Sequence, residues 1–553
     1  MNRLLQTFFG WGRKRCVMAK KADLIIINAN VYTVDEAIPT AEAVAVRGSR
    51  ICFVGSSAEA QSWRGSQTRV IDGAGCTLLP GFIDSHLHLL LGSLEMSDIQ
   101  LYAVATLPEL TAAVQAYAAA NPQLTWLQGS GLRYGIPADE PLSWQHLDRI
   151  EGERPLVLTA YDGHTMWANS AALKKAGLLS NESLSSDNRL VVKGADGQMS
   201  GELREAAMGL VTAYIPEPDD HEKRAALRRG LAYLASLGVT SVQNMDGDAA
   251  QAALYAALED LGELTLRVYV PYSVTPATTV EMLATEAVAL RDHFNSEMVR
   301  GGSVKFFMDG VLESYTAVML NGYPDQPENF GKPNYSTEHF AALATAADSL
   351  GLQIFVHACG DGAVRRVLDG YETAQRGNGR RDSRHRVEHI EVIHADDLPR
   401  FAGLGVIASM QPLHAPLNAG QEDVWRERVQ QADWDRSFAW RTLREAGAVL
   451  AFGSDWSVAS PDPIAGIYAA LNRQPWGAGH EAQAQTMAEA IASYTRDAAY
   501  AEFQEAVKGQ IKVGLWADLV LLTADIFSVP PEDLLDVRVA LTICNGRVVY
   551  ERA

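Results

Sequence analysis

Two histidines interrupt an apolar run where burial alone would favour aliphatic side chains. The segment GFIDSHLHLL carries His86 and His88 at alternate positions, and on a β-strand this spacing puts both imidazoles on one face. Neutral imidazole is a good ligand for zinc and neighbouring divalent metals. The pair therefore indicates a metal site, provided that further donors reach the same face.

Further donor side chains lie in, or at the end of, later apolar runs. They are Lys305, His357, His389 and Asp455. A buried ammonium group beside metal cations would be strongly disfavoured, whereas a lysine that has added carbon dioxide is an anion able to bridge two ions. We therefore predict a carboxylated Lys305, with a plain lysine paired to Asp309 or Glu313 as the alternative.

The runs that carry these donors alternate with Ala- and Leu-rich helical stretches, a pattern typical of repeated β-α units. Nine candidate strands occur, and we set aside PLVLTAYDGH because it lies in the long interval between residues 90 and 238. The remaining eight predict an α/β fold, a (β/α)8 TIM-type barrel over residues 81–504, whose C-terminal strand ends form the active site. Residues from about 100 to 220 are then an insert after the first barrel strand.

Both ends of the chain favour short antiparallel strands. Gly48-Ser49 and Asn545-Gly546 separate apolar runs in the manner of two-residue hairpin turns. We predict a small β-sandwich domain assembled from residues 21–80 and 505–553, preceded by a disordered tail over residues 1–20.

Composition narrows the classes of function. The 553 residues carry a formal net charge of −20, which argues against binding to nucleic acid or to an anionic membrane surface. No stretch approaches the ~18 apolar residues of a membrane span. The five cysteines are scattered and form no CxxC pair, as expected in a reducing compartment. We expect a cytoplasmic protein that binds a small-molecule substrate, with neither nucleic acid nor membrane as a partner.

Several motifs resemble those of the amidohydrolase superfamily, and the resemblance covers nearly the whole chain. LLPGFIDSHLH, FGSDW and VGLWADLVLL are similar to that superfamily's first barrel strand, last-strand aspartate and return to its small β domain. SVKFFMDGVLESYTA, VHACGDGAVRRVL, RVEHIE and YDGHTMWANSAAL resemble the branch that contains the N-substituted formamide deformylases. The chain departs from that branch at Glu313 and Tyr315, where a small residue and an arginine are usual, which predicts an altered substrate pocket.

The resemblance implies a binuclear metal centre and a role for the insert. Its metal ligands would be His86, His88 and Asp455 on one ion, His357 and His389 on the other, and carboxylated Lys305 as the bridge. Two zinc ions per chain are the default, and iron, manganese or nickel are alternatives that the sequence does not distinguish. The resemblance also implies that His164 faces the active site, and a homodimer is common among such relatives.

The predicted activity is hydrolysis of a C–N amide-type bond other than a peptide bond, in an N-acyl or N-formyl amide. A metal lowers the pKa of bound water from ~15.7 to about 7, and Asp455 would act first as general base and then as general acid toward the leaving nitrogen. Substrate contacts are predicted for His164, Gln411, His414 and Trp456.

Three alternatives remain open at the level of sequence. A lactone or carbamate hydrolase would use the same machinery with a different leaving group. A cyclic-amidine deaminase is a further enzymatic alternative, although such deaminases usually lack the bridging lysine that Lys305 offers. A non-catalytic metal-binding sensor or regulatory protein is the alternative of another class, and loss of a ligand position would favour it.

Overall fold

An eight-stranded parallel sheet lies at the centre of the computed structural model, which describes residues 21–179, 190–194, 197–416 and 424–553. The predicted tail, residues 1–20, lies outside this range. The strands follow one another around the sheet in chain order, which is the arrangement of a (β/α)8 barrel. They are β8 (Phe82–Leu87), β15 (Val239–Asn244), β16 (Arg267–Ser273), β17 (Val299–Phe307), β18 (Gln353–Ala358), β19 (Arg386–His389), β20 (Ile407–Met410) and β21 (Val449–Phe452). The predicted TIM-type fold is confirmed.

Helices cover the outside of the barrel, because each strand points alternate side chains outward. On β17, Val304 and Phe306 join a core cluster with Phe340 of a covering helix, while Lys305 between them faces the interior. The main covering helices are α7 (Asp220–Ser236), α8 (Ala249–Asp260), α11 (Thr337–Ser349), α12 (Asp361–Asn378), α13 (Leu398–Leu404), α15 (Trp440–Glu445) and α16 (Pro463–Asn472). After α7, Gly238 adopts a left-handed φ of 81° and leads the chain into β15.

The first and last barrel strands meet just beyond the end of β21. The amide of Asp455 donates to the carbonyl of His86 at 2.6 Å, and the amide of His88 donates to the carbonyl of Trp456 at 2.8 Å. Gly453 lies at this junction, and a Cβ atom there would approach the His86 nitrogen to 2.5 Å. Only glycine therefore lets the two strands come together, and the same contact brings Asp455 beside the two histidines.

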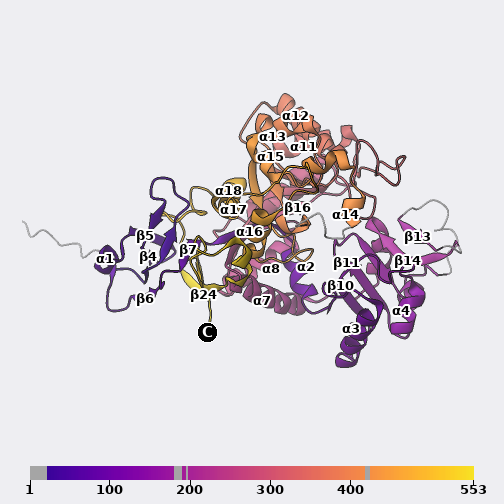
Figure 1. The fold of residues 1–553 in the computed structure, drawn as a ribbon, viewed down its shortest axis with the longest axis horizontal. Coiled ribbons are helices and arrows are strands. Elements are labelled where there is room, and N and C mark those ends of the chain that lie inside the picture. Colours follow the sequence, from indigo (N-terminus) through magenta and orange to yellow (C-terminus); the bar gives the residue numbers. More distant parts are fainter. Residues whose placement is uncertain (1–20, 180–189, 195–196, 417–423) are drawn as a thin grey trace, which may run out of the picture.

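The long interval between β8 and β15 folds into a separate six-stranded sheet (Figure 1, right). Its strands are β9 (Ile99–Gln100), β10 (Leu127–Leu132), β11 (Leu156–Ala160), β12 (Thr165–Ala168), β13 (Val191–Lys193) and β14 (Met199–Arg204). Strand β11 is the PLVLTAY segment that we had excluded from the barrel. The loops at one end of this sheet reach over the barrel mouth, as the lining of the cavity described below shows.

Segments from both chain ends form two further sheets at the opposite side of the barrel (Figure 1, left). One contains β1 (Leu24–Ile27), β4 (Ala43–Arg47), β5 (Arg50–Gly55) and β6 (Arg69–Asp72), and the other contains β2 (Asn30–Tyr32), β3 (Thr40–Ala41), β7 (Thr77–Pro80), β22 (Leu519–Leu522), β23 (Val539–Cys544) and β24 (Arg547–Glu551). Both predicted hairpin turns are present, at Gly48-Ser49 between β4 and β5 and at Asn545-Gly546 between β23 and β24.

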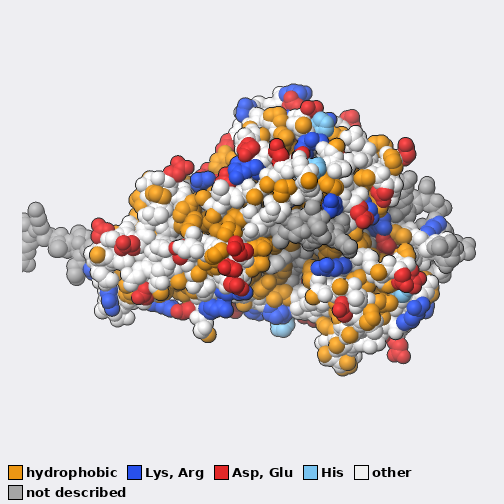
Figure 2. All heavy atoms as spheres, in the orientation of Figure 1, with side chains coloured by type: hydrophobic (Ala, Val, Ile, Leu, Met, Phe, Trp, Pro, Cys, Tyr) orange, Lys and Arg blue, Asp and Glu red, His pale blue; other side chains and the backbone are white. Residues whose placement is uncertain are grey.

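The surface mixes apolar and charged side chains. On the face that Figure 2 shows, acidic and basic groups are interspersed among apolar ones. Within the described residues, no helix has both the length and the apolar character that crossing a membrane requires.

Candidate metal centre and substrate cavity

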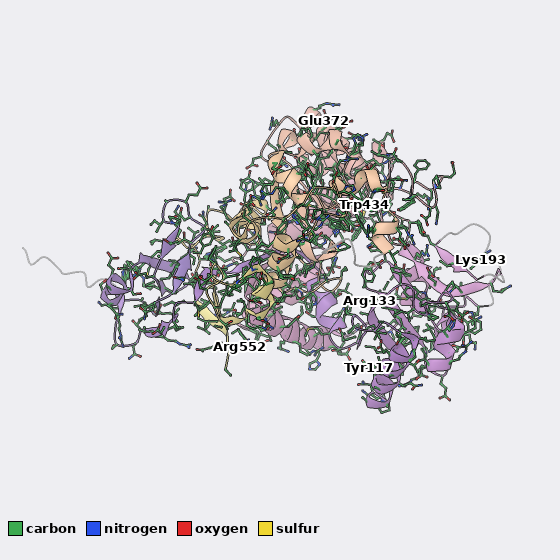
Figure 3. All side chains as sticks on the ribbon, viewed as in Figure 1. Tyr117, Arg133, Lys193, Glu372, Trp434 and Arg552 are labelled. Carbon is green, nitrogen blue, oxygen red and sulfur yellow. The ribbon has the colours of Figure 1, made fainter. Side chains whose placement is uncertain are left out.

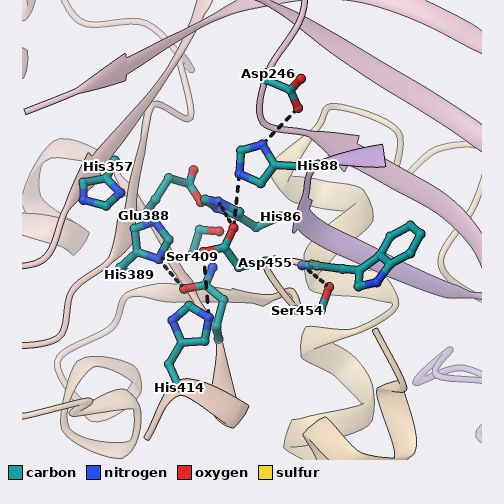
Figure 4. A network of polar contacts seen from close by, with 12 residues as sticks. His86, His88, Asp246, His357, Glu388, His389, Ser409, His414, Ser454 and Asp455 are labelled. Atoms are coloured by element: carbon teal, nitrogen blue, oxygen red, sulfur yellow. Dashed lines mark hydrogen bonds and ion pairs between the residues drawn. The ribbon is translucent and has the colours of Figure 1, made fainter. Parts of the chain in front are cut away.

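His86 and His88 point at one carboxylate from the end of β8 (Figure 4). Their Nε2 atoms lie 3.3 Å and 3.2 Å from Oδ1 of Asp455. Each Nδ1 atom is hydrogen-bonded to a carboxylate. Nδ1 of His86 lies 2.7 Å from Oε2 of Glu388, and Nδ1 of His88 lies 2.9 Å from Oδ1 of Asp246. A carboxylate on Nδ1 fixes the ring and leaves Nε2 as the coordinating atom, which is the usual support of a metal-bound histidine.

His357 and His389 also present one ring nitrogen each that makes no hydrogen bond to another described residue. Nε2 of His357 donates to the carbonyl of Gly310 at 3.0 Å, and Nδ1 of His389 donates to Oε1 of Gln411 at 2.9 Å. Burial lowers the pKa of both imidazoles, that of His357 to about 3. Both rings are therefore neutral, and each keeps a lone pair. The two rings lie 4.5 Å apart between centroids.

Left-handed backbone at two of these residues directs their side chains into the barrel mouth. His389 has φ 74° and Asp455 has φ 58°, values that few residues other than glycine adopt. Along β19, Glu388 already points inward, so simple alternation would turn the next residue, His389, outward. The unusual φ instead keeps His389 in the mouth, and such local strain is common at functional sites.

Lys305 lies on β17 and is buried in the barrel interior. It is 1% exposed, its Nζ has no hydrogen-bond partner, and its charge lies 4.6 Å from the ring of Phe307. Burial lowers the pKa of Lys305 to about 8, although nearby carboxylates oppose the shift. A salt bridge to Asp309, one of the two partners in our alternative, does not form, because the Asp309 carboxylate accepts backbone N–H groups instead.

The donors fit a divalent cation. Ligand atoms of His86, His389 and Asp455 lie within 4.8 Å of one another. Among the described residues, Lys305 Nζ is a buried atom without a hydrogen bond, which is costly unless something compensates it. His86 Nε2 and Asp455 Oδ1 are buried too, and among the same residues each has only the ion-pair contacts at Oδ1 given above. Burial alone would raise the pKa of Asp455, but the surrounding histidines hold it well below its ordinary value. An acidic oxygen and imidazole nitrogens thus lie close together around one point.

Comparison with known proteins identifies the family. The model of a family described as "Amidohydrolase family" matches residues 69–550. The chain belongs to the amidohydrolase family. It is 31% identical over 546 residues to the "Protein LONG AFTER FAR-RED 3" of Arabidopsis thaliana, an alignment that covers 96% of this chain and 92% of that protein.

Two further relatives of this amidohydrolase agree over nearly their full lengths. The "N-substituted formamide deformylase" of Arthrobacter pascens is 27% identical over 548 residues, covering 97% of this chain and 99% of that enzyme. An "uncharacterized metal-dependent hydrolase" from Pyrococcus furiosus has a similar solved structure, with a TM-score of 0.70, 25% identity, and coverage of 90% of this chain and 98% of that one.

A cavity of about 420 Å³ opens beside the donors of this amidohydrolase. His357, His389 and Asp455 form part of its wall, together with residues of the insert. The insert contributes Tyr102, Gly131, Arg133, Tyr134, Tyr161, Asp162 and His164, and barrel loops contribute Val311, Glu313, Cys359, Glu391, Leu413, His414, Ala415, Pro416, Val424, Val458 and Ala459. The volume is within the range of small-molecule sites.

His164 of the insert lies in this cavity, with its ring centroid 5.4 Å from that of His357. Its Nδ1 is 2.8 Å from Oε2 of Glu205, whose other oxygen accepts the hydroxyl of Thr316 at 2.5 Å. Burial by itself would lower the pKa of His164, but Glu205 and Asp162 raise it to about 9. Sequence reasoning missed Glu205, because nothing in its local pattern relates it to a histidine 41 residues away.

The three remaining predicted pocket residues have different positions. His414 lines the cavity and stacks on His389 with ring centroids 5.8 Å apart. Gln411 is outside the lining and orients His389 instead. Trp456, the third predicted pocket residue, is outside the lining of this cavity. Its indole packs outside the barrel against Gly92, where a Cβ atom would come within 2.7 Å of the ring. The left-handed turn at Asp455 points the following side chain away from the mouth.

A second cluster, Asp309, His357 and Cys359, has ligand atoms within 4.8 Å of one another but is already satisfied. The Asp309 oxygens accept three backbone N–H groups, and Nε2 of His357 donates to a carbonyl. Burial also raises the pKa of the Cys359 thiol well above its ordinary value, which disfavours the thiolate. These groups shape the loop around His357, and Cys359 is a packed thiol.

Proposed function

We propose that this amidohydrolase hydrolyses a C–N amide-type bond in a small N-acyl or N-formyl amide, using bound divalent metal. The observation that carries the proposal is the convergence of His86, His88, His389 and Asp455 beside a substrate-sized cavity. The similarity to an N-substituted formamide deformylase over 99% of that enzyme supports the choice of a C–N bond.

The donor side chains at the barrel mouth would hold two ions. His86, His88 and Asp455 would bind one, His357 and His389 the other, and Lys305, carboxylated on its unpartnered Nζ, would lie between them. Zinc is the expected metal, with iron, manganese or nickel as substitutes. The bound metal supplies a hydroxide nucleophile at neutral pH and polarises the substrate carbonyl.

Asp455 moves the proton. Its carboxylate stays ionised because the neighbouring histidines lower its pKa, so it can accept a proton from the attacking water. The same oxygen can then donate that proton to the leaving nitrogen, which departs as a neutral amine. His86 and His88 hold the carboxylate in place through the contacts to Oδ1.

His164 binds the substrate from its position beside His357. Its pKa of about 9 keeps the ring protonated at neutral pH, so Nε2 can donate a hydrogen bond to the carbonyl oxygen or to the leaving group. Glu205 fixes the ring through Nδ1 at 2.8 Å, which leaves Nε2 for the substrate.

A substrate panel with the metal-replete protein tests the proposal. It contains N-formyl amines, N-acyl amino acids, aryl amides, a lactone, a carbamate and a cyclic amidine. Amide or formamide cleavage, together with about two ions per chain by elemental analysis, is the expected result. Absence of bound metal, or turnover of the lactone, carbamate or amidine alone, would contradict it. Carbon-13 NMR after incubation with labelled bicarbonate tests Lys305 carboxylation separately from activity.

A further inference from the structure

The insert and the barrel meet at a small polar contact beside the cavity. Arg133, which lines the cavity, lies on the barrel side of the insert, and Lys193 lies at its far end (Figure 3). Glu205, directly after β14 of the insert, contacts Thr316 in the loop that follows β17. The contact therefore joins the end of an insert strand to the end of a barrel strand.

The hydroxyl of Thr316 is at the centre of this contact. It donates to Oε1 of Glu205 at 2.5 Å, which is closer than its other acceptor, the carbonyl of Val311 at 3.2 Å. It accepts the amide N–H of Val311 at 3.0 Å, and Oγ of Ser314 lies 2.7 Å away. A hydroxyl has a single proton to donate, so Ser314 is the donor toward Thr316. Partners from the insert and from the barrel thus fix the position of one hydroxyl.

Glu205 connects this hydroxyl to His164. Its Oε2 lies 2.8 Å from Nδ1 of His164, while its Oε1 accepts the proton of Thr316. The amide of Glu205 also donates to the carbonyl of His164 at 2.9 Å. Its left-handed φ of 48° is a conformation that persists only where the surrounding structure supports it. Because both oxygens of the carboxylate are bound, the position of the Thr316 hydroxyl sets the direction of the His164 ring.

Thr316 also lies directly against Gly310. A Cβ atom at position 310 would overlap both the hydroxyl oxygen of Thr316 and Oε1 of Glu205, so the three groups are in close contact. The amide of Gly310 donates to the carbonyl of Thr316 at 3.3 Å, and its carbonyl accepts Nε2 of His357 at 3.0 Å. The loop around Thr316 therefore supports His357 through the backbone of Gly310.

We propose that Thr316 is a positioning residue that orients two histidines of the site at once, His164 through Glu205 and His357 through Gly310. The two rings lie 5.4 Å apart between centroids. One comes from the insert and the other from the barrel, so a shared support keeps their separation fixed. This inference rests on the proposed function, in which His164 binds the substrate and His357 binds metal, and it adds a residue outside the cavity lining.

Removal of the hydroxyl at constant side-chain size tests the inference. Thr316→Val makes this change, and Thr316→Ser restores the hydroxyl. The full-length protein with isotope-labelled histidine is incubated with zinc and studied by NMR. The imidazole signals of His164 and His357 should both be displaced in Thr316→Val and restored in Thr316→Ser. The signal of His357 should also be displaced in a His164→Ala background, since its support passes through Gly310. Chelator competition should show a zinc affinity about 10-fold lower in Thr316→Val.

Thr542→Val on β23 is the matched control, because its buried hydroxyl donates to the carbonyl of Ala235 at 2.7 Å. It should lower stability and leave both imidazole signals and the zinc affinity unchanged. Where Thr316→Val does not fold, Thr316→Ala replaces it with the same expected displacement.

The inference is overturned if the signals stay in place without the hydroxyl, if only one of the two moves, or if Thr316→Ser does not restore them. The NMR measurement requires neither bound metal nor turnover. Displaced signals in a protein that binds no zinc would therefore support the inference and count against the proposed function alone.

Discussion

Two buried histidines, His385 directly before strand β19 and His389 at its end, are in opposite situations. At the start, His385 uses both ring nitrogens: Nδ1 accepts the amide N–H of Ile354 at 3.2 Å, and Nε2 donates to Asp348 at 3.0 Å. At the other end, His389 donates only from Nδ1, to Gln411. Both are almost fully buried, at 3% and 4% exposed.

Burial and a polar partner therefore do not by themselves mark a functional histidine. What distinguishes His389 is a ring nitrogen that makes no hydrogen bond within the described part of the chain and that faces other donors. This difference follows the polarity of the barrel, in which the N-terminal strand ends stabilise the fold and the C-terminal ends carry the chemistry.

The largest expected effect concerns Asp455, at the C-terminal ends of the barrel strands. Asp455→Asn keeps the size of the side chain but cannot take a proton, so kcat should fall by about 10³-fold or more. Metal content should be largely retained, because the histidines remain. Steady-state kinetics with elemental analysis of the same sample measures both. An Asp455→Asn protein with near-normal kcat would remove the proton-transfer role.

Around His385, at the N-terminal end of β19, the expected loss is in stability and not in activity. Asp348 binds His385 and also accepts hydrogen bonds from Asn378, Arg381 and Ser383. Asp348→Asn should lower the free energy of unfolding by about 3 kcal/mol, since it breaks a buried charged network, while kcat per folded molecule stays unchanged. Denaturant unfolding measures the loss. The nearby exposed Asp382 provides the control Asp382→Asn, which should cost under about 1 kcal/mol, because its partner Arg384 also binds Glu505.

The pH dependence of this stability has a definite sign. Burial would raise the pKa of Asp348, but its hydrogen-bond donors, His385 first, hold it well below its ordinary value of 3.8. A depressed folded-state pKa stabilises the protein above the unfolded-state pKa and ceases to do so as the carboxylate is protonated. The stability difference between the wild type and Asp348→Asn should therefore be constant near neutral pH and shrink below about pH 4. A difference that grew on acidification would contradict this account.

A smaller effect is expected from the side chain that contacts Nδ1 of His86 and so orients its ring. Glu388 joins His86 to the buried guanidinium of Arg386 at 2.7 Å and 2.8 Å. Glu388→Gln should weaken metal binding by about 10- to 100-fold, because such supporting contacts orient the ligand. Chelator competition measures the affinity, with Glu372→Gln, a partly exposed glutamate in surface ion pairs, as the matched control. Unchanged affinity would mean that the His86 ring is oriented by packing alone.

The smallest effect concerns His164. Glu205→Gln removes the charged partner of its Nδ1, and we expect kcat/KM to fall by about 10-fold as the ring loses its orientation. If Glu205 acts only through His164, the double variant Glu205→Gln/His164→Ala should be no worse than His164→Ala alone. Additive losses would assign Glu205 a separate role.

Local patterns were sufficient to predict much of the fold. Alternation and apolar runs located all eight barrel strands, and chain spacing excluded the PLVLTAY strand from them. Glycine and asparagine located two hairpins, because positive φ is a property of the residue itself. The position of Trp456 outside the cavity lining could not be read from the sequence, since the left-handed turn at Asp455 results from the meeting of the first and last strands and has no local signal.

The sequence by itself determined which donor types stand at which strand ends, because side-chain periodicity and apolar runs are local properties. The tertiary structure alone decided which ring nitrogen of His86, His88 and His389 is hydrogen-bonded and which is available to coordinate a metal. The hydrogen-bond partners Glu388, Asp246 and Gln411 come from other strands or their loops. It also decided the character of the cavity, where loops of the insert meet Glu313 and Glu391 of the barrel. Contacts between residues distant in sequence depend on closure of the barrel, and no short-range pattern encodes them.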